Sequence, residues 1–307
     1  MRRAVHLPWL DTPFARVTGQ ILKDTLGHAL LIGVDAAQGG EWLAQDIGAT
    51  ALCLSPAQDG ACGQCKSCHL VQAGNHPDLH QVRADGSQIK IDQIRDLCNA
   101  LTATAQQGGQ RVVIIYACER MNQASANALL KTLEEPGKNT LLLLQTQTPA
   151  RLLPTIASRC QKLAYVAPDR QIICDWLMQQ HQVSEDITWV LPVAGGPLVL
   201  AESLGNGDYQ RWLQYRQDWR ASLMSGHLCG SLLELKEEHI VEALKVLYLV
   251  LRSRVIQPGK LDAFALSQII ALADRVMRQC HHLETMASVN YLALCQKFVL
   301  EYKQVTQ

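Results

Sequence analysis

The chain has 307 residues, of which 48% are hydrophobic and 18% are charged, an ordinary composition for a globular protein with room for two or three cores. Lys and Arg total 28, and so do Asp and Glu, so the formal charge is zero, which argues against a protein that grips DNA by itself. No run reaches the roughly 18 apolar residues of a membrane span, and residues 1–9 have no apolar stretch typical of a signal peptide. We therefore expect a cytoplasmic protein with no membrane partner.

The first half of the chain alternates short apolar runs with helix-like segments. The apolar runs are typical of strands buried on both faces of a parallel sheet; they lie at residues 28–34, 79–82, 111–117, 140–146 and 162–166. Helical segments are expected between them, at residues 40–47, 92–104 and 123–135. This alternation predicts an open α/β sheet with helices on both faces.

The composition shifts after residue 166. A helical stretch begins at residue 168, a second small helical region ends at residues 194–197, and long amphipathic helices follow from about residue 206. We therefore predict three domains: an α/β domain over residues 1–166, a small helical domain over residues 167–205 and an all-helical domain over residues 206–307.

Four cysteines in the first quarter of the chain predict a metal site: Cys53, Cys62, Cys65 and Cys68. Two cysteines separated by two residues can hold one metal ion from a tight turn, and Gly60 and Gly63 permit the sharp backbone that such a knuckle needs. An iron–sulfur run would continue with a further cysteine where this chain has Gln72. Because four thiolates leave no open coordination position, we favour a structural zinc ion; buried or disulfide-bonded thiols and another metal are the alternatives.

The loop after the first strand stands where a phosphate-binding P-loop would lie. That motif needs G-x-x-x-x-G-K-[ST], so that backbone amides cradle the phosphates and the lysine reaches the outer ones. Counted from Gly33, the second glycine is replaced by Gln38, the lysine by Gly39 and the hydroxyl residue by Gly40, while Asp35 adds a negative charge. We therefore expect tight binding of a nucleoside triphosphate to fail and no ATP to be bound by this chain.

The strand at residues 111–117 lacks the second half of an ATPase site. A Walker B strand ends in acidic residues that hold magnesium and polarise water, but Tyr116 and Ala117 follow the apolar part of this strand, and Glu119 comes too late. These losses disfavour an autonomous P-loop ATPase. A zinc-containing nucleic-acid-binding protein is the other alternative; the zero net charge and a knuckle with Lys66 as its one lysine argue against it.

Four motifs together resemble bacterial clamp-loader subunits of the AAA+ class: the four-cysteine knuckle, Ile91–Arg95, Asn127–Pro136 and Ser158–Cys160. The degraded P-loop narrows the resemblance to the delta prime family of DNA polymerase III. It is dense over residues 20–166 and thinner beyond. The resemblance implies an AAA+ P-loop-type parallel-sheet domain with a zinc module inserted at about residues 53–68, a helical lid domain and a C-terminal helical collar domain that forms oligomers.

The same resemblance implies a non-catalytic subunit of a hetero-pentameric ring, together with tau or gamma motor subunits and a delta subunit. The ring loads the sliding clamp onto primed DNA during replication. The chain would then be no enzyme by itself but part of a DNA-directed DNA polymerase holoenzyme, a nucleotidyltransferase at the level of the complex. In this family the motif matched by Ser158, Arg159 and Cys160 supplies an arginine finger in trans to a neighbour's ATP, and the sensor-2 arginine would fall near Val199.

The chemistry of arginine agrees with that role for Arg159, because a guanidinium keeps its charge and presents a planar fork of donors to phosphate oxygens. The alternative from the residues alone is an intrachain ion pair or a helix-end contact. Lys131, Glu134 and Glu135 precede the stop at Pro136, and they mark either a solvated helix face or a contact within the ring or with DNA.

Overall fold

The structure is a computed structural model that describes residues 6–102, 104–107, 109–183, 185–257, 259, 261–283 and 290–306. The first five residues, part of the stretch in which we expected no signal peptide, lie outside the described residues. Contacts divide the chain into two compact units, Met1–Trp176 and Leu177–Gln307. The finer division into three domains stays a prediction.

The first unit contains a five-stranded parallel sheet in the order β2-β3-β4-β1-β5. Its strands are β1 (Ala29–Ile32), β2 (Leu79–Val82), β3 (Arg111–Ile115), β4 (Thr140–Gln145) and β5 (Gln161–Lys162). All residues of β1, β3 and β4 are buried, which explains why their apolar runs show no alternation. The fifth strand is shorter than the predicted run at residues 162–166, because at the sheet edge it pairs only with β1 and Val166 is 86% exposed.

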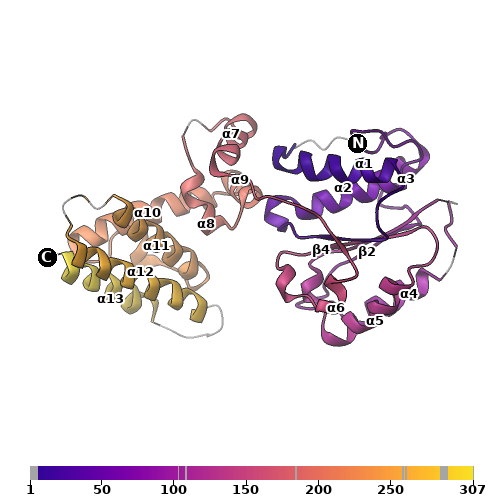
Figure 1. Ribbon diagram of the computed structural model, residues 1–307. Coiled ribbons are helices and arrows are strands. Elements are labelled where there is room, and N and C mark those ends of the chain that lie inside the picture. Colours follow the sequence, from indigo (N-terminus) through magenta and orange to yellow (C-terminus); the bar gives the residue numbers. More distant parts are fainter. Residues whose placement is uncertain are drawn as a thin grey trace. The chain divides into compact units, whose positions relative to one another are not determined.

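Helices cover both faces of this sheet (Figure 1). On one face lie α1 (Asp11–Leu22), α2 (Gly40–Leu52) and the short α3 (Lys66–Gln72); on the other lie α4 (Ile91–Ala100), α5 (Gln123–Glu134) and α6 (Pro154–Ala157). The α2 helix is longer than predicted, since Ala49 and Leu52 continue its buried face, and α4 ends earlier, at Ala100. The parallel sheet with helices on both faces confirms the predicted α/β fold of this part of the chain.

Alternate strand residues feed two apolar layers. Val113, Ile115, Leu142 and Leu144 form the main core with residues of α4 and α5. On the opposite face, Gly48 of α2 packs closely on the sheet: a Cβ atom there would lie 3.3 Å from side-chain carbons of Val112 and Ile114. The close approach of α2 fixes the loop between β1 and α2, which is the loop that the sequence singled out.

The second unit is helical. Its longer helices are α9 (Pro197–Asn206), α10 (Asp208–Ser225), α11 (Ile240–Ile256), α12 (Ala263–Leu283) and α13 (Tyr291–Thr306), preceded by α8 (Leu191–Ala194). The α7 helix (Arg170–His181) spans the division between the units. Trp219 of α10 is fully buried and its Nε1 donates to the Ala243 carbonyl at 2.8 Å, so it serves packing between α10 and α11. In the part of the chain that the structure describes, no helix has the length and apolar character needed to cross a bilayer.

Candidate functional site

The four predicted cysteines converge at the end of α2. Cys53 directly follows α2, Cys65 is the N-cap of α3, and all four Sγ atoms lie within 4.8 Å of one another. The Sγ atoms of Cys53 and Cys65 are 4.0 Å apart, and those of Cys62 and Cys68 are 3.9 Å apart. A zinc tetrahedron with Zn–S bonds of about 2.3 Å has sulfur–sulfur edges of about 3.8 Å, whereas a disulfide bond is about 2.05 Å. The cluster therefore has the size of a metal tetrahedron and not of two disulfides.

Backbone turns shape the knuckle, as predicted. Gly60 and Gly63 have φ angles of +107° and +74°, which side chains other than glycine adopt rarely. At Gly60 a Cβ atom would also lie 2.7 Å from the ring of Phe14. The N–H of Cys62 donates to the Sγ of Cys53 at 3.3 Å. Such N–H···S contacts stabilise thiolates, the form of cysteine that binds metals.

The pKa values of the four thiols shift in different directions. Burial raises the pKa of the Cys65 thiol, but hydrogen bonds from Cys68, Leu54 and Cys62 lower it more, to about 6. Burial raises the pKa of Cys68 to about 12, assisted by the neighbouring thiols. Without a metal ion, the cluster thus shares its protons unequally. A bound divalent cation would compensate the charge of the thiolates, so the thiols would lose their protons when it binds.

A Ser–His–Asp group lies next to the knuckle, which the sequence did not reveal. The Oγ of Ser67 is 2.9 Å from Nε2 of His76, while Nδ1 of His76 accepts the backbone N–H of Asp78 at 3.1 Å. Because Nδ1 is an acceptor, the proton is on Nε2 and is donated to Ser67, whose hydroxyl donates to the Leu52 carbonyl at 2.6 Å. The imidazole therefore does not act as a base toward the serine. The group instead ties α3 to the end of α2 and to β2.

The loop between β1 and α2 is closed on itself. Asp35 accepts the N–H of Ala37 through its side chain at 2.8 Å, and its carbonyl accepts the N–H groups of Gln38 and Gly40 at 3.0 and 2.9 Å. Amides that would cradle phosphates in a P-loop thus have partners within the loop. Gly39 has φ of +91°, and a Cβ atom on Gly40 would lie 2.0 Å from the Val34 carbonyl oxygen.

Neighbouring side chains also cover this loop. Trp9 donates from Nε1 to the Gln38 carbonyl at 2.7 Å, and the hydroxyl of Tyr165 donates to the Gln38 side chain at 3.1 Å. A Cβ atom on Gly39 would lie 2.4 Å from a methyl group of Leu7. Gly39, which replaces the P-loop lysine, is therefore packed against the N-terminal segment, whereas Gly40 is packed against the backbone of Val34.

Side chains at the carboxyl ends of β3 and β4 satisfy one another. Gln145, fully buried at the end of β4, donates to the Val34 carbonyl at 2.8 Å and accepts the N–H of Ala117 at 2.9 Å. Tyr116, which stands where a Walker B carboxylate would be expected, donates to Gln81 at 2.8 Å. Glu119 lies in the 3₁₀ turn Cys118–Arg120, where its Oε1 is 3.5 Å from the N–H of Gln147.

An arginine occupies the space near Tyr116. The guanidinium carbon of Arg83 lies 3.7 Å from the centre of the Tyr116 ring, and Nη1 of Arg83 is 2.8 Å from Oε2 of Glu41, the second residue of α2. This ion pair and cation–π contact link α2 to β3 at the edge where open α/β sheets bind their ligands. These contacts could not be predicted from the sequence, because the three residues are far apart along the chain.

Arg159 follows the C-cap residue Ser158 of α6, and α6 lies on the same face of the sheet as α4 and α5 (Figure 1). Cys160 is 9% exposed and belongs to the main core, so it anchors the motif, and burial raises its pKa to about 11. Ser158 is exposed, and its hydroxyl donates to the Thr155 carbonyl at 3.3 Å. The Arg159 side chain is 37% exposed, and it forms an ion pair with Glu134 of α5. The structure thus contains the intrachain ion pair that the sequence left open as an alternative.

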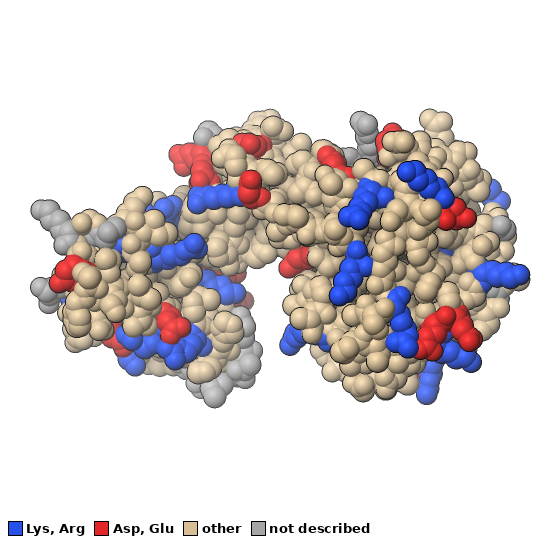
Figure 2. Space-filling view, in the orientation of Figure 1, with Lys and Arg blue, Asp and Glu red and all other residues tan. Residues whose placement is uncertain are grey.

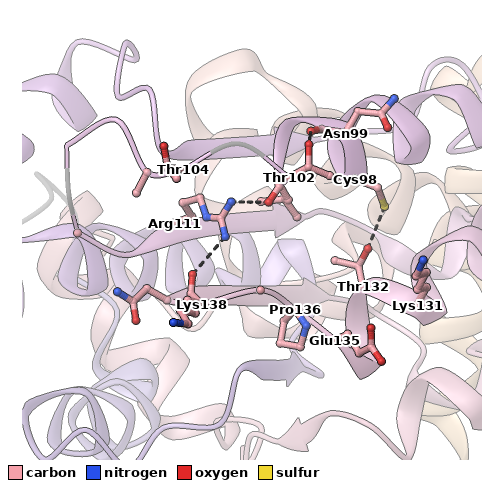
Figure 3. Close-up of a pocket in the computed structure, with 15 residues that line it drawn as sticks. Cys98, Asn99, Thr102, Thr104, Arg111, Lys131, Thr132, Glu135, Pro136 and Lys138 are labelled. Atoms are coloured by element: carbon pink, nitrogen blue, oxygen red, sulfur yellow. Dashed lines mark hydrogen bonds between the residues drawn. The ribbon is translucent and has the colours of Figure 1, made fainter.

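Glu134 and Glu135 have different surroundings. Glu134 pairs with Arg159, whereas Glu135 and Lys131 line a cavity of about 720 Å³ at the amino ends of β3 and β4 (Figure 3). Arg111 lies at this cavity, and its guanidinium donates to the Leu101 carbonyl and to Thr140 Oγ1. Neither the four cysteines of the predicted metal site nor Arg159 is among the residues that line this cavity.

Charged side chains on the visible face of the molecule are scattered, with Asp and Glu among the Lys and Arg (Figure 2). This distribution agrees with a formal charge of zero. The structure thus defines a class of protein. It is an α/β protein with a parallel sheet, a four-cysteine site and a helical second unit, and the loop at its P-loop position is closed.

Comparison with known proteins identifies the family. The family model described as "DNA polymerase III, delta subunit" matches residues 11–168, about half of the chain. A relative from Haemophilus influenzae named "DNA polymerase III subunit delta'" is 40% identical over 217 residues, which are 69% of this chain and 66% of the relative. The relative of the same name from Escherichia coli is 35% identical over 205 residues, 66% of this chain and 61% of the relative. The chain belongs to the DNA polymerase III delta prime family, as its motifs predicted.

The matched stretch spans less than two thirds of the length of these relatives. Among solved structures, a "dna polymerase iii, gamma subunit-related protein" from Thermotoga maritima covers 95% of this chain and is itself covered to 99%, with a TM-score of 0.47 and 16% identity. A likeness of that size supports no inference about the function of this chain.

Proposed function

We propose that this chain is an ATPase-inactive subunit of the DNA polymerase III clamp loader, and that it acts in the bacterial cytoplasm during replication. Membership in the delta prime family supports its place in the polymerase assembly. As partners we propose tau or gamma motor subunits and a delta subunit in a hetero-pentamer, the sliding clamp, and primed DNA reached through the assembly. The chain contributes no polymerase chemistry of its own.

The observation that carries the ATPase-inactive part of the proposal is the closed loop between β1 and α2. Asp35 already accepts the N–H groups that a triphosphate would need, and Gly39 and Gly40 offer neither the lysine nor the magnesium-binding hydroxyl. A phosphate there would meet the Asp35 carboxylate instead of a cation. At the end of β3, Tyr116 replaces the acid that would hold magnesium.

We assign Arg159 the role of an arginine finger that acts in trans, at the ATP site of a neighbouring subunit. Its side chain is partly exposed at the end of α6, beside Ser158 and above the buried Cys160. From that place the guanidinium reaches the phosphates of ATP bound by a neighbouring motor subunit and stabilises the charge that develops during hydrolysis. Arginines supplied in this way raise hydrolysis rates by about 10³-fold or more.

The metal in the proposal is structural zinc. The four thiolates of Cys53, Cys62, Cys65 and Cys68 would hold the ion and close its coordination sphere, so zinc would stabilise the knuckle and take no part in catalysis.

The closed loop predicts that the isolated chain does not bind ATP. Calorimetric titration of the chain with ATP and magnesium should give no heat of binding at concentrations up to about 1 mM, whereas a motor subunit with an intact P-loop, titrated in parallel, should bind in the micromolar range. Saturable micromolar binding by this chain would overturn the ATPase-inactive proposal. It would revive the autonomous ATPase.

A further inference from the structure

Two acceptors from different helices hold the guanidinium of Arg159. Nη2 donates to Oε1 of Glu134 in the last turn of α5, and Nη1 donates to the Thr155 carbonyl of α6 at 2.8 Å. Glu134 precedes Arg159 by 25 residues, so this contact is made by the fold and not by chain proximity. One of the two contacts on the guanidinium therefore comes from outside its own segment, and the other comes from the preceding turn.

Both acceptors belong to anchored elements. Leu129 and Leu133 of α5 are 0% and 1% exposed, and Ile156 of α6 is 0% exposed. The helices that carry Glu134 and Thr155 thus cannot shift without disturbing the main core. These partners favour one direction for a long arginine side chain that otherwise samples many rotamers.

The contacts leave the guanidinium able to bind a ligand. It has five N–H donors, and the two contacts use one hydrogen on Nη1 and one on Nη2. The side chains of Arg159 and Glu134 are 37% and 51% exposed, so solvent screens the ion pair and makes it weak. Glu134 can therefore direct the arginine without withholding it from a phosphate.

We propose that Glu134 is a positioning residue for Arg159. It presets the guanidinium in the orientation that a neighbouring subunit's ATP requires, so that ordering the side chain costs less when the subunits meet. This inference rests on the proposed function, because it assigns Glu134 a part in catalysis through Arg159. Glu134 itself touches no substrate in this account.

The test is a double-mutant cycle in the reconstituted clamp loader, with Glu134→Gln, Arg159→Ala and both together. The readout is ATP turnover stimulated by clamp and primed DNA, with assembly checked by size exclusion. We expect Glu134→Gln to lower kcat about three- to ten-fold, Arg159→Ala to lower it further, and the double variant to match Arg159→Ala. Glu134→Asp, which keeps a carboxylate on a shorter side chain, should fall between wild type and Glu134→Gln.

Glu135→Gln is the matched control. It removes the same charge from the next residue. Glu135 lines the cavity at the amino ends of β3 and β4 and has no ion pair with Arg159. It should leave turnover unchanged.

The outcomes separate the two proposals. If Glu134→Gln equals or exceeds wild type, or if the double variant falls clearly below Arg159→Ala, Glu134 does not act through Arg159 and this inference is wrong, while the proposed function stands. If Arg159→Ala itself leaves turnover unchanged in an assembled loader, the arginine-finger proposal fails and takes this inference with it.

Discussion

The cysteine thiols and the Arg159 guanidinium are held in place in different ways. Cys53, Cys65 and Cys68 take their positions from short turns and from N–H···S contacts within the knuckle. The buried members of the knuckle pack in a small apolar cluster of their own with Ala49 and Ala61. The Arg159 guanidinium contacts Glu134, a residue from another helix, and the Thr155 carbonyl. Loss of metal should therefore act locally, whereas loss of the Arg159 contacts acts at the exposed end of α6.

Substitution of one thiol tests the metal site. Cys68→Ser should reduce bound zinc from about one ion per chain to none, because serine is a poor ligand for zinc compared with a thiolate. Elemental analysis of the purified protein measures this directly. Cys98→Ser, which changes a half-buried cysteine outside the cluster, should keep the metal.

The location of the damage is a second part of this prediction. Hydrogen exchange of Cys68→Ser, or of the wild type after chelation, should rise within about residues 53–72 and stay slow in β1, β3 and β4, since the sheet has a separate core. A single cooperative loss of protection throughout the first unit would contradict a local role for the metal.

Among the secondary-structure elements, the carboxyl edge of the sheet holds together through a few long-range polar contacts. Gln145 joins the ends of β1, β3 and β4 through Val34 and Ala117. Arg83 and Glu41 join α2 to the strand ends. In open α/β proteins a ligand usually binds at this edge of the sheet. In this chain, protein side chains bind one another there.

Gln145→Leu tests this closure. The substitution keeps the size of the side chain but leaves a buried carbonyl and a partly buried N–H without partners, at about 1–3 kcal/mol for each group. We expect a clear fall in the urea midpoint of the first unit, equivalent to about 2–4 kcal/mol. Gln147→Leu, two residues on and exposed, should cost less than about 0.5 kcal/mol. Equal stability of the two variants would show that the Gln145 contacts do not hold the edge.

The elements themselves could be predicted because their signals are local. The apolar runs at β1, β3 and β4 reflect burial on both faces, and α5 begins at Gln123, the predicted start of that helix. The cysteine site could be predicted because its ligands lie within 16 residues and are joined by tight turns. Periodicity does not say which distant residues become partners, so the contacts of Gln145, Arg83 and Glu134 were not predictable.

Edge effects also escaped the sequence. The run at residues 162–166 has the composition of a buried strand, yet only Gln161 and Lys162 form β5, because the edge position provides one partner strand and the chain then leaves the sheet. The role of Ser158, Arg159 and Cys160 stays a prediction from the motif, and the structure adds that Arg159 pairs with Glu134.

Three features of the whole molecule are consistent with a subunit of an assembly. Its formal charge is zero, the loop between β1 and α2 is closed by Asp35, and Arg159 of its motif is partly exposed. A protein with these properties would contribute a charged group to a partner's site without turning over a nucleotide itself. We therefore expect the chain to activate, in trans, the hydrolysis of ATP that is bound by a neighbouring subunit.

The most direct test of this claim is the ATP turnover of a clamp loader reconstituted with wild-type chain or with Arg159→Ala. Turnover is measured with clamp and primed DNA present, and size exclusion verifies that both loaders assemble. We expect normal assembly and a fall in turnover of about ten-fold or more, because one arginine is removed from a phosphoryl-transfer site. Unchanged turnover in the assembled Arg159→Ala loader would contradict it and would reduce the chain to a scaffold.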